Sequence, residues 1–179
     1  MWYNVLHEGE SMNKYLFDYE YMKIVNNILN NDTFNEIDSI IHHGTSRLTH
    51  SIRVSYYSYK IAKKLNLDYT SCARGGLLHD FFMSDNNRNK KEKLLSTFIH
   101  PKYAVINANE IITLNDKEKN IIRSHMFPIN LSIPKYLESW IVSLVDKVIG
   151  LYEFFITYKN PLKYATQYLY IFTFLSYFN

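Results

Sequence analysis

The sequence of 179 residues has few of the residues that cross-link a chain or interrupt helices. Its single cysteine, Cys72, excludes an internal disulfide and is typical of a protein in a reducing compartment. Only five glycines and four prolines are present, and no alternating apolar pattern bounded by hairpin turns indicates strands. With so few turn signals, the helical spacing of apolar residues predicts an all-α protein.

A strong excess of charge and a long apolar run are also lacking. The 20 basic and 17 acidic residues give a formal net charge of +3, too small to indicate nucleic acid or an anionic membrane as a partner. The longest apolar stretch, Leu169–Phe178, is shorter than the roughly 20 residues of a membrane-spanning helix. Residues 1–12 lack the basic start and apolar run of a signal peptide. We therefore expect a cytoplasmic protein that binds neither a membrane nor nucleic acid.

The composition, with 47% hydrophobic and 21% charged residues, indicates one globular domain with a core. We expect an N-terminal extension over residues 1–12 and one helical domain over 13–179. Apolar periodicity and capping residues predict eight helices. The first four are a helix over 13–30, a short one from Asp32 or Thr33 to Gly44, a long one from Thr45 or Ser46 to Leu65, and a central one from Thr70 or Ser71 through His79 and Asp80. The other four are one from Pro101, one capped by Asp116, one over 135–158 and a last one after Pro161. The polar run 84–96 predicts an exposed loop, which would make His100 the N-cap before Pro101.

The adjacent pair His79 and Asp80 lies in an apolar stretch, Arg74–Phe82. Burying a carboxylate costs several kcal/mol or more unless it is paired or bound to a cation. Alone, such a pair is more often a satisfied core histidine beside a capping aspartate. The rest of the chain changes that interpretation, because further inward-facing histidines and an aspartate occur at similar intervals.

Six ionisable residues are predicted to face inward from five helical segments: His50, His79, Asp80, His100, His125 and Asp146. They recur about 20 to 30 residues apart, roughly one helix and a turn, so consecutive helices could direct them to a common point. Imidazole and carboxylate ligands suit iron, manganese, zinc, nickel or cobalt better than calcium. The two oxygens of Asp80 could bridge two such ions.

This order of residues resembles the HD-domain superfamily of metal-dependent phosphohydrolases over about residues 42–155. The resemblance rests on His50 in Arg-Leu-Thr-His-Ser-Ile-Arg-Val, the His79-Asp80 doublet, and Asp146 in Ser-Leu-Val-Asp-Lys-Val. His100 in His-Pro-Lys-Tyr-Ala and His125 in Ile-Ile-Arg-Ser-His-Met-Phe-Pro resemble the two additional histidines of dinuclear members. The resemblance implies a single-domain bundle of about six to eight helices that holds divalent transition metal.

The resemblance also implies how the ligands are shared. One ion would be held by His50, His79, Asp80 and Asp146, and a second by Asp80, His100 and His125; a single ion is the alternative. The implied reaction is hydrolysis of a phosphate ester, of a nucleotide or another small molecule, by a metal-activated hydroxide. Arg47, three residues before His50, and Lys147, directly after Asp146, are expected to neutralise the charge that develops on the phosphoryl group, unless they form only surface salt bridges.

Departures from the family leave other functions open. The cyclic-di-GMP phosphodiesterase branch has Gly-Lys shortly after its His-Asp and a later Gly-Tyr-Pro, whereas this chain has Phe82-Met83 and no Gly-Tyr-Pro. That substrate is therefore disfavoured. The same six residues also resemble mixed-valent di-iron oxygenases of the superfamily, and a regulatory protein that binds metal without turnover is a third alternative. The aromatic tail at 164–178 is compatible with a homodimer.

Overall fold

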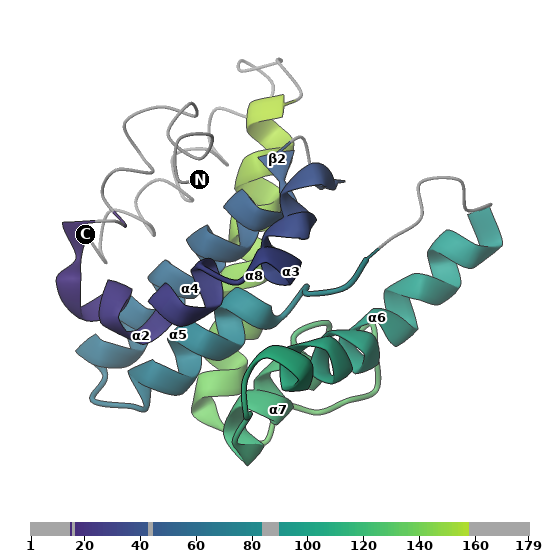
Figure 1. Ribbon diagram of the computed structural model, residues 1–179. Helices are drawn as coiled ribbons and strands as arrows, with labels where there is room; N and C mark the ends of the chain where they lie inside the picture. Colours follow the sequence, from purple (N-terminus) through teal and green to yellow (C-terminus); the bar gives the residue numbers. More distant parts are fainter. Residues whose placement is uncertain (1–14, 16, 43–44, 84–89, 158–179) are drawn as a thin grey trace.

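The computed structural model describes residues 15, 17–42, 45–83 and 90–157 (Figure 1). These residues form seven α-helices, one short 3-10 helix and a pair of two-residue strands. The prediction of an all-α protein is therefore confirmed. The expected extension at 1–12 and the aromatic tail at 164–178 lie outside the described residues.

The N-terminal helices begin at side-chain caps. Helix α2 (Tyr19–Leu29) begins after Asp18, whose carboxylate accepts a hydrogen bond from the Tyr21 amide. The extended backbone of Asp18 interrupts the helix that was predicted over 13–30. Asn31, rather than Asp32 or Thr33, caps α3 (Asp32–Asn35). Asn31 can do so because its side-chain oxygen accepts a hydrogen bond from the Phe34 amide.

The prediction that a short helix continues to Gly44 was wrong. The 3-10 helix η2 (Glu36–Ser39) follows α3, and Ile40 is then extended. Strand β1 (Ile41–His42) pairs antiparallel with β2 (Thr45–Ser46). The β-branched pair Ile40 and Ile41 favours extended backbone over helix, which explains the change. Gly44 itself lies outside the described residues.

The two central helices carry the first of the predicted ligands. Helix α4 (Arg47–Lys64) is capped by Ser46, as predicted. Helix α5 (Tyr69–Leu78) is capped by Asp68 rather than Thr70 or Ser71, because the Asp68 carboxylate accepts from both the amide and the hydroxyl of Ser71. The helix ends at Leu78, so His79 and Asp80 lie in the turn that comes after it, not within a helix as expected.

The prediction of a loop over 84–96 was wrong from residue 90 onward. Helix α6 (Lys90–Ile111) runs through Pro101, so His100 lies within a helix instead of capping one. Residues 90–95 are lysine, glutamate and leucine, which are strong helix formers. A helix that is already under way can tolerate one proline, which removes a single intrahelical hydrogen bond. Residues 84–89 lie outside the described part.

Two further helices complete the described bundle. Helix α7 (Asp116–Ser124) begins with a capping box in which Asn115, not Asp116, is the cap and Glu118 returns the bond. Helix α8 (Leu137–Thr157) matches the prediction of 135–158 to within the usual uncertainty of helix ends. No helix among the described residues combines the length and apolarity needed to cross a bilayer.

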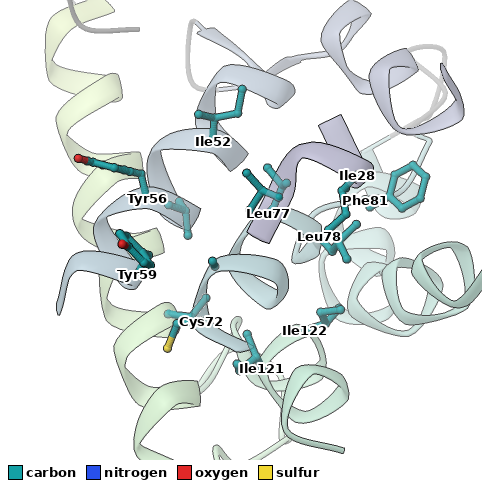
Figure 2. Packing of buried hydrophobic residues seen from close by; sticks show 14 of the residues in the cluster. Ile28, Ile52, Tyr56, Tyr59, Cys72, Leu77, Leu78, Phe81, Ile121 and Ile122 are labelled. Carbon is teal, nitrogen blue, oxygen red and sulfur yellow. The ribbon is translucent and has the colours of Figure 1, made fainter. Parts of the chain in front are cut away.

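The helices pack around one core, with α4, α5 and α8 next to one another and α6 beside α7 (Figure 1). Figure 2 shows Ile28, Leu78 and Phe81 gathered on one side of α5, with Ile121 and Ile122 of α7 on another. Helix α5 is therefore enclosed by apolar neighbours, and the His79-Asp80 turn at its end is held inside the molecule. Both residues are buried.

Candidate metal centre

The structure brings the six predicted ligands together from five places in the fold. His50 lies on the first turn of α4, His79 and Asp80 come directly after α5, and His100 lies in the middle of α6. The remaining two are His125, directly after α7, and Asp146, in the middle of α8. All four histidines and Asp80 are buried, and Asp146 is partly buried.

One part of the cluster forms around Asp146. Its Oδ1 lies 3.1 Å from Nε2 of His50 and 3.5 Å from Nε2 of His79. The two imidazole rings are 5.4 Å apart between centroids. Two nitrogen atoms thus converge on one carboxylate oxygen from α4 and from the end of α5.

The other part forms around Asp80. Its Oδ1 lies 3.2 Å from Nε2 of His100 and 3.4 Å from Nε2 of His125, and these two nitrogens are 3.1 Å apart. Its Oδ2 lies 3.8 Å from Nε2 of His79. Asp80 therefore contacts histidines of both parts, one oxygen toward each.

Backbone carbonyls fix the orientation of two of the histidines. Nδ1 of His79 donates to the Gly76 carbonyl at 2.8 Å, and Nδ1 of His125 donates to the Ile122 carbonyl at 2.8 Å. A carbonyl only accepts, so Nδ1 carries a proton, and in the neutral imidazole Nε2 presents a lone pair to the cluster. Nε2 of His79 is buried and makes no hydrogen bond within the part of the chain that the structure describes. A metal ion would satisfy a buried lone pair of this kind.

The donor set fits a metal ion. Three groups of three residues have ligand atoms that all lie within 4.8 Å of one another: His50, His79 and Asp80; His79, His125 and Asp146; Asp80, His100 and His125. Mixed nitrogen and oxygen donors are those that first-row transition metals take in proteins. Because the groups share His79, Asp80 and His125, the same residues could serve more than one ion.

An HD-domain family profile matches residues 47–150, more than half of the chain. The chain belongs to the HD-domain family. No curated protein and no solved structure matches it. Membership confirms the resemblance read from the sequence and places this HD-domain protein in a superfamily of metal-dependent hydrolases whose members bind divalent metals. Every predicted ligand lies within the matched range.

The charges of this HD domain are strongly coupled. Burial alone would raise the pKa of Asp80, but the charge of His79 and the contacts with His100 and His125 hold it well below its ordinary value. The pKa of Asp146 is likewise held well below its ordinary value, against the effect of burial, by the contact with His50 and by the neighbouring His79. Both carboxylates are thus anions, the form that binds a cation.

The histidines of the HD domain differ from one another. Burial would lower the pKa of His50, but hydrogen bonds to Asp146 and Glu153 outweigh it and raise the pKa to about 10. Burial lowers the pKa of His125 despite the neighbouring Asp80, which keeps that imidazole neutral. Neutral imidazole is the form that ligates a metal, so His125 is ready to bind, whereas His50 would release a proton on binding.

Arg47 is held against Phe82 at the edge of the cluster. Its guanidinium is buried, donates to the Phe82 carbonyl and lies 4.0 Å from the centre of the Phe82 ring. Burial lowers the pKa of Arg47, and the charge of Asp80 opposes that effect. The predicted positive charge therefore lies near Asp80, although a role in catalysis stays a prediction.

Lys147 is tied to the backbone beside a predicted ligand. Its Nζ donates to the carbonyls of His125 at 2.8 Å and of Ser143 at 3.0 Å, and to the Ser143 hydroxyl at 2.8 Å. An ammonium has three hydrogens, so these contacts use all of them. Its predicted role as a neutralising charge also stays a prediction.

Sequence reasoning missed Glu153. Its Oε2 lies 2.7 Å from Nδ1 of His50, on the side of the ring away from Asp146. Glu153 is on α8, seven residues after Asp146, which places both on one helix face. That spacing was a usable signal, although Glu153 lies beyond the matched range of the family profile.

Proposed function

We propose that this HD-domain protein is a metal-dependent phosphohydrolase that cleaves a phosphate ester of a nucleotide or another small molecule. The position of Asp80 carries the proposal, because one carboxylate oxygen faces His79 and the other faces His100 and His125. A carboxylate that contacts two groups of ligands can bridge two ions. In this proposal the ions are divalent transition metals, iron, manganese, cobalt, nickel or zinc. The proposed ligands are His50, His79, Asp80 and Asp146 for one ion, and Asp80, His100 and His125 for the other.

Bound metal would polarise the phosphoryl oxygens and lower the pKa of a bound water. The residues of the chain have separate tasks. Asp80 and Asp146 supply negative charge that holds the cations in place. Arg47, near Asp80, and Lys147, next to Asp146, supply positive charge for the charge that develops on the phosphoryl group. Lys147 also keeps the backbone of His125 fixed. Because the histidines are buried, bulk water is largely kept from their ligand atoms.

The first experiment is elemental analysis of the purified protein, followed by phosphate release from a panel of nucleotides with manganese, cobalt or iron added. Bis(4-nitrophenyl) phosphate and 4-nitrophenyl phosphate distinguish a diesterase from a monoesterase. We expect close to two metals per chain and release of phosphate or of nitrophenol. Size-exclusion chromatography with light scattering tests the proposed homodimer, and fractionation of cells tests the proposed cytoplasmic location.

Asp80→Asn keeps the shape of the side chain and removes its charge. We expect this variant to lose metal and hydrolysis together, while Asp116→Asn, at an exposed position on α7, keeps both. Full activity of Asp80→Asn would contradict the proposed site. Two irons per chain with oxygen uptake and no phosphate release would replace the proposal with the oxygenase alternative. Bound metal with neither reaction would favour the regulatory alternative.

A further inference from the structure

Glu153 is a buried carboxylate that none of the predicted ligand groups contains. It lies near the C-terminal end of α8, and only 2% of its side-chain surface is exposed. Its two oxygens contact different partners on α4. Oε2 lies 2.7 Å from Nδ1 of His50, and Oε1 accepts from Nη1 of Arg53 at 2.8 Å. A buried carboxylate without partners would be strongly unfavourable, so these two contacts make its position tenable.

Arg53 lies three residues after His50, so both side chains leave the same face of α4 toward α8. Arginine stays protonated under all ordinary conditions. Its contact with Oε1 therefore keeps a positive charge next to Glu153 and fixes the orientation of the carboxylate. The order Arg53, Glu153, His50 forms a chain of contacts that ends at a predicted metal ligand.

The carboxylate acts on the ring nitrogen of His50 that faces away from the cluster. When His50 is a ligand, Nδ1–H donates to Glu153, which leaves the lone pair on Nε2, the atom that lies 3.1 Å from Asp146 Oδ1. His79 and His125 use backbone carbonyls for the same purpose. An anionic acceptor makes an imidazole a stronger donor to a metal than a neutral carbonyl does.

We propose that Glu153 is a positioning residue for the metal ion held by His50, and that Arg53 keeps the Glu153 carboxylate aligned with the His50 ring. This inference rests on the proposed metal site and goes beyond it, because it assigns a task to two residues that are not ligands. It also predicts asymmetry between the two ions. His50 belongs to only one of the two proposed ligand sets, so Glu153 should support one ion and not the other.

Glu153→Gln tests the charge of the carboxylate at nearly constant shape. The full-length protein, freed of metal, is titrated with cobalt(II), and binding is followed by calorimetry and by the visible spectrum of bound cobalt. We expect one of the two binding events to weaken by about 10- to 100-fold and the other to stay unchanged. Arg53→Met, which leaves Glu153 in place, should weaken the same event by a smaller factor.

Glu138→Gln is the matched control, because Glu138 is a second buried glutamate of α8 that pairs with a cation, Lys117. It should leave both binding events and the cobalt spectrum unchanged. A Glu153→Gln protein that binds both ions with wild-type affinity would overturn the inference. So would an equal loss at both events, which is what a purely structural tie between α4 and α8 would produce.

This test is separable from the test of hydrolysis. If no substrate releases phosphate but Glu153→Gln still weakens one ion selectively, the positioning role stands and the proposed reaction falls. If phosphate is released and both ions bind Glu153→Gln normally, the reaction stands and the positioning role falls. A wild-type protein that binds no metal would overturn both.

Discussion

Phe82 connects two of the groups that the proposed reaction needs. The guanidinium of Arg47 lies 4.0 Å from the centre of its ring, and the imidazole of His100 stacks on it with the ring centres 4.7 Å apart and an angle of 29° between the planes. A planar guanidinium can stack on a ring and donate to a carbonyl at the same time, which a lysine ammonium cannot do equally well. The orientation of Arg47 therefore depends on its shape as well as its charge.

Arg47→Lys separates shape from charge. We expect the variant to keep its metal, because Arg47 is not a ligand, and to lose at least about ten-fold in the rate of phosphate release, or about 1.4 kcal/mol. The measurement is kcat and metal content on the same preparation. Arg74→Lys is the control, because it removes another guanidinium that donates to a backbone carbonyl, that of Thr113. Wild-type kcat in Arg47→Lys would show that its planar contact with Phe82 is dispensable.

At the scale of elements, α4 and α5 approach each other closely at Gly76. A β-carbon added there would lie 3.0 Å from the Cα of Ser55 and 3.3 Å from its amide nitrogen. These atoms belong to the backbone of α4, so they can move only if the helix moves. The carbonyl of Gly76 also accepts from His79, so the close approach positions a predicted ligand.

Gly76→Ala should lower the free energy of unfolding by about 1–3 kcal/mol, because over-packing outweighs the roughly 1 kcal/mol that alanine gains in helix propensity. Urea denaturation gives the value. Gly75→Ala provides a comparison, since its β-carbon would meet the Ile121 side chain at 2.8 Å. Ile121→Ala should relieve part of the Gly75→Ala cost but none of the Gly76→Ala cost. Unchanged stability of Gly76→Ala would contradict the close approach.

A charged cluster joins three other helix ends. Lys117, on α7, contacts Glu138 of α8 at 2.7 Å and Asp68, the cap of α5, at 3.3 Å. Burial would raise the pKa of both carboxylates, but Lys117 and hydrogen bonds to the backbone and to Ser71 lower them instead. Acids whose pKa is lowered on folding stabilise the folded state at pH values above their pKa in the unfolded chain, which is about 4. This stabilisation is lost as the pH falls through the lower pKa values that the two carboxyls have in the folded state.

Lys117→Met should weaken this pH dependence. Protons bind the unfolded chain first on acidification, so the stability of the wild type should fall as the pH drops below about 4. Without Lys117 the folded pKa values of Asp68 and Glu138 rise toward the unfolded ones, and the slope over this range should be shallower. Urea denaturation at several pH values between about 3 and 6 measures both slopes. Identical slopes in the two proteins would mean that the cluster adds nothing to acid stability.

The sequence was informative where a local pattern alone decides the outcome. The inward position of His50 results from helical spacing, and the Ser46 cap from the chemistry of a helix start. The sequence was a poor guide to the bounds of a helix where two local signals compete. Pro101 is an ordinary first residue of a helix, yet the helix formers before it extend α6 upstream. The seven-residue spacing from Asp146 indicates the helix face of Glu153, but its contact with His50, 103 residues away, is decided by how α4 and α8 pack.

At the scale of the whole molecule, the candidate centre brings charge into the interior. Two carboxylates and four histidines meet from five elements, and buried like charges and lone pairs repel one another unless a cation lies between them. The helices α4, α5, α6, α7 and α8 each contribute or adjoin at least one of these residues. A metal ion would therefore stabilise the bundle as a whole, because its ligands come together only in the folded chain.

Metal should consequently raise the melting temperature of the wild type. A ligand that binds only the folded state at 100 times its Kd stabilises it by about 2.7 kcal/mol, or about 5–10 °C for a chain of this length. Calorimetry of the metal-free protein, with and without added manganese or cobalt, measures the shift, and a chelator should reverse it. Asp80→Asn should show little or no shift, whereas Glu138→Gln should keep it. An equal shift in Asp80→Asn would place the stabilising ion elsewhere, because Asp80 is the carboxylate that both proposed ligand sets share.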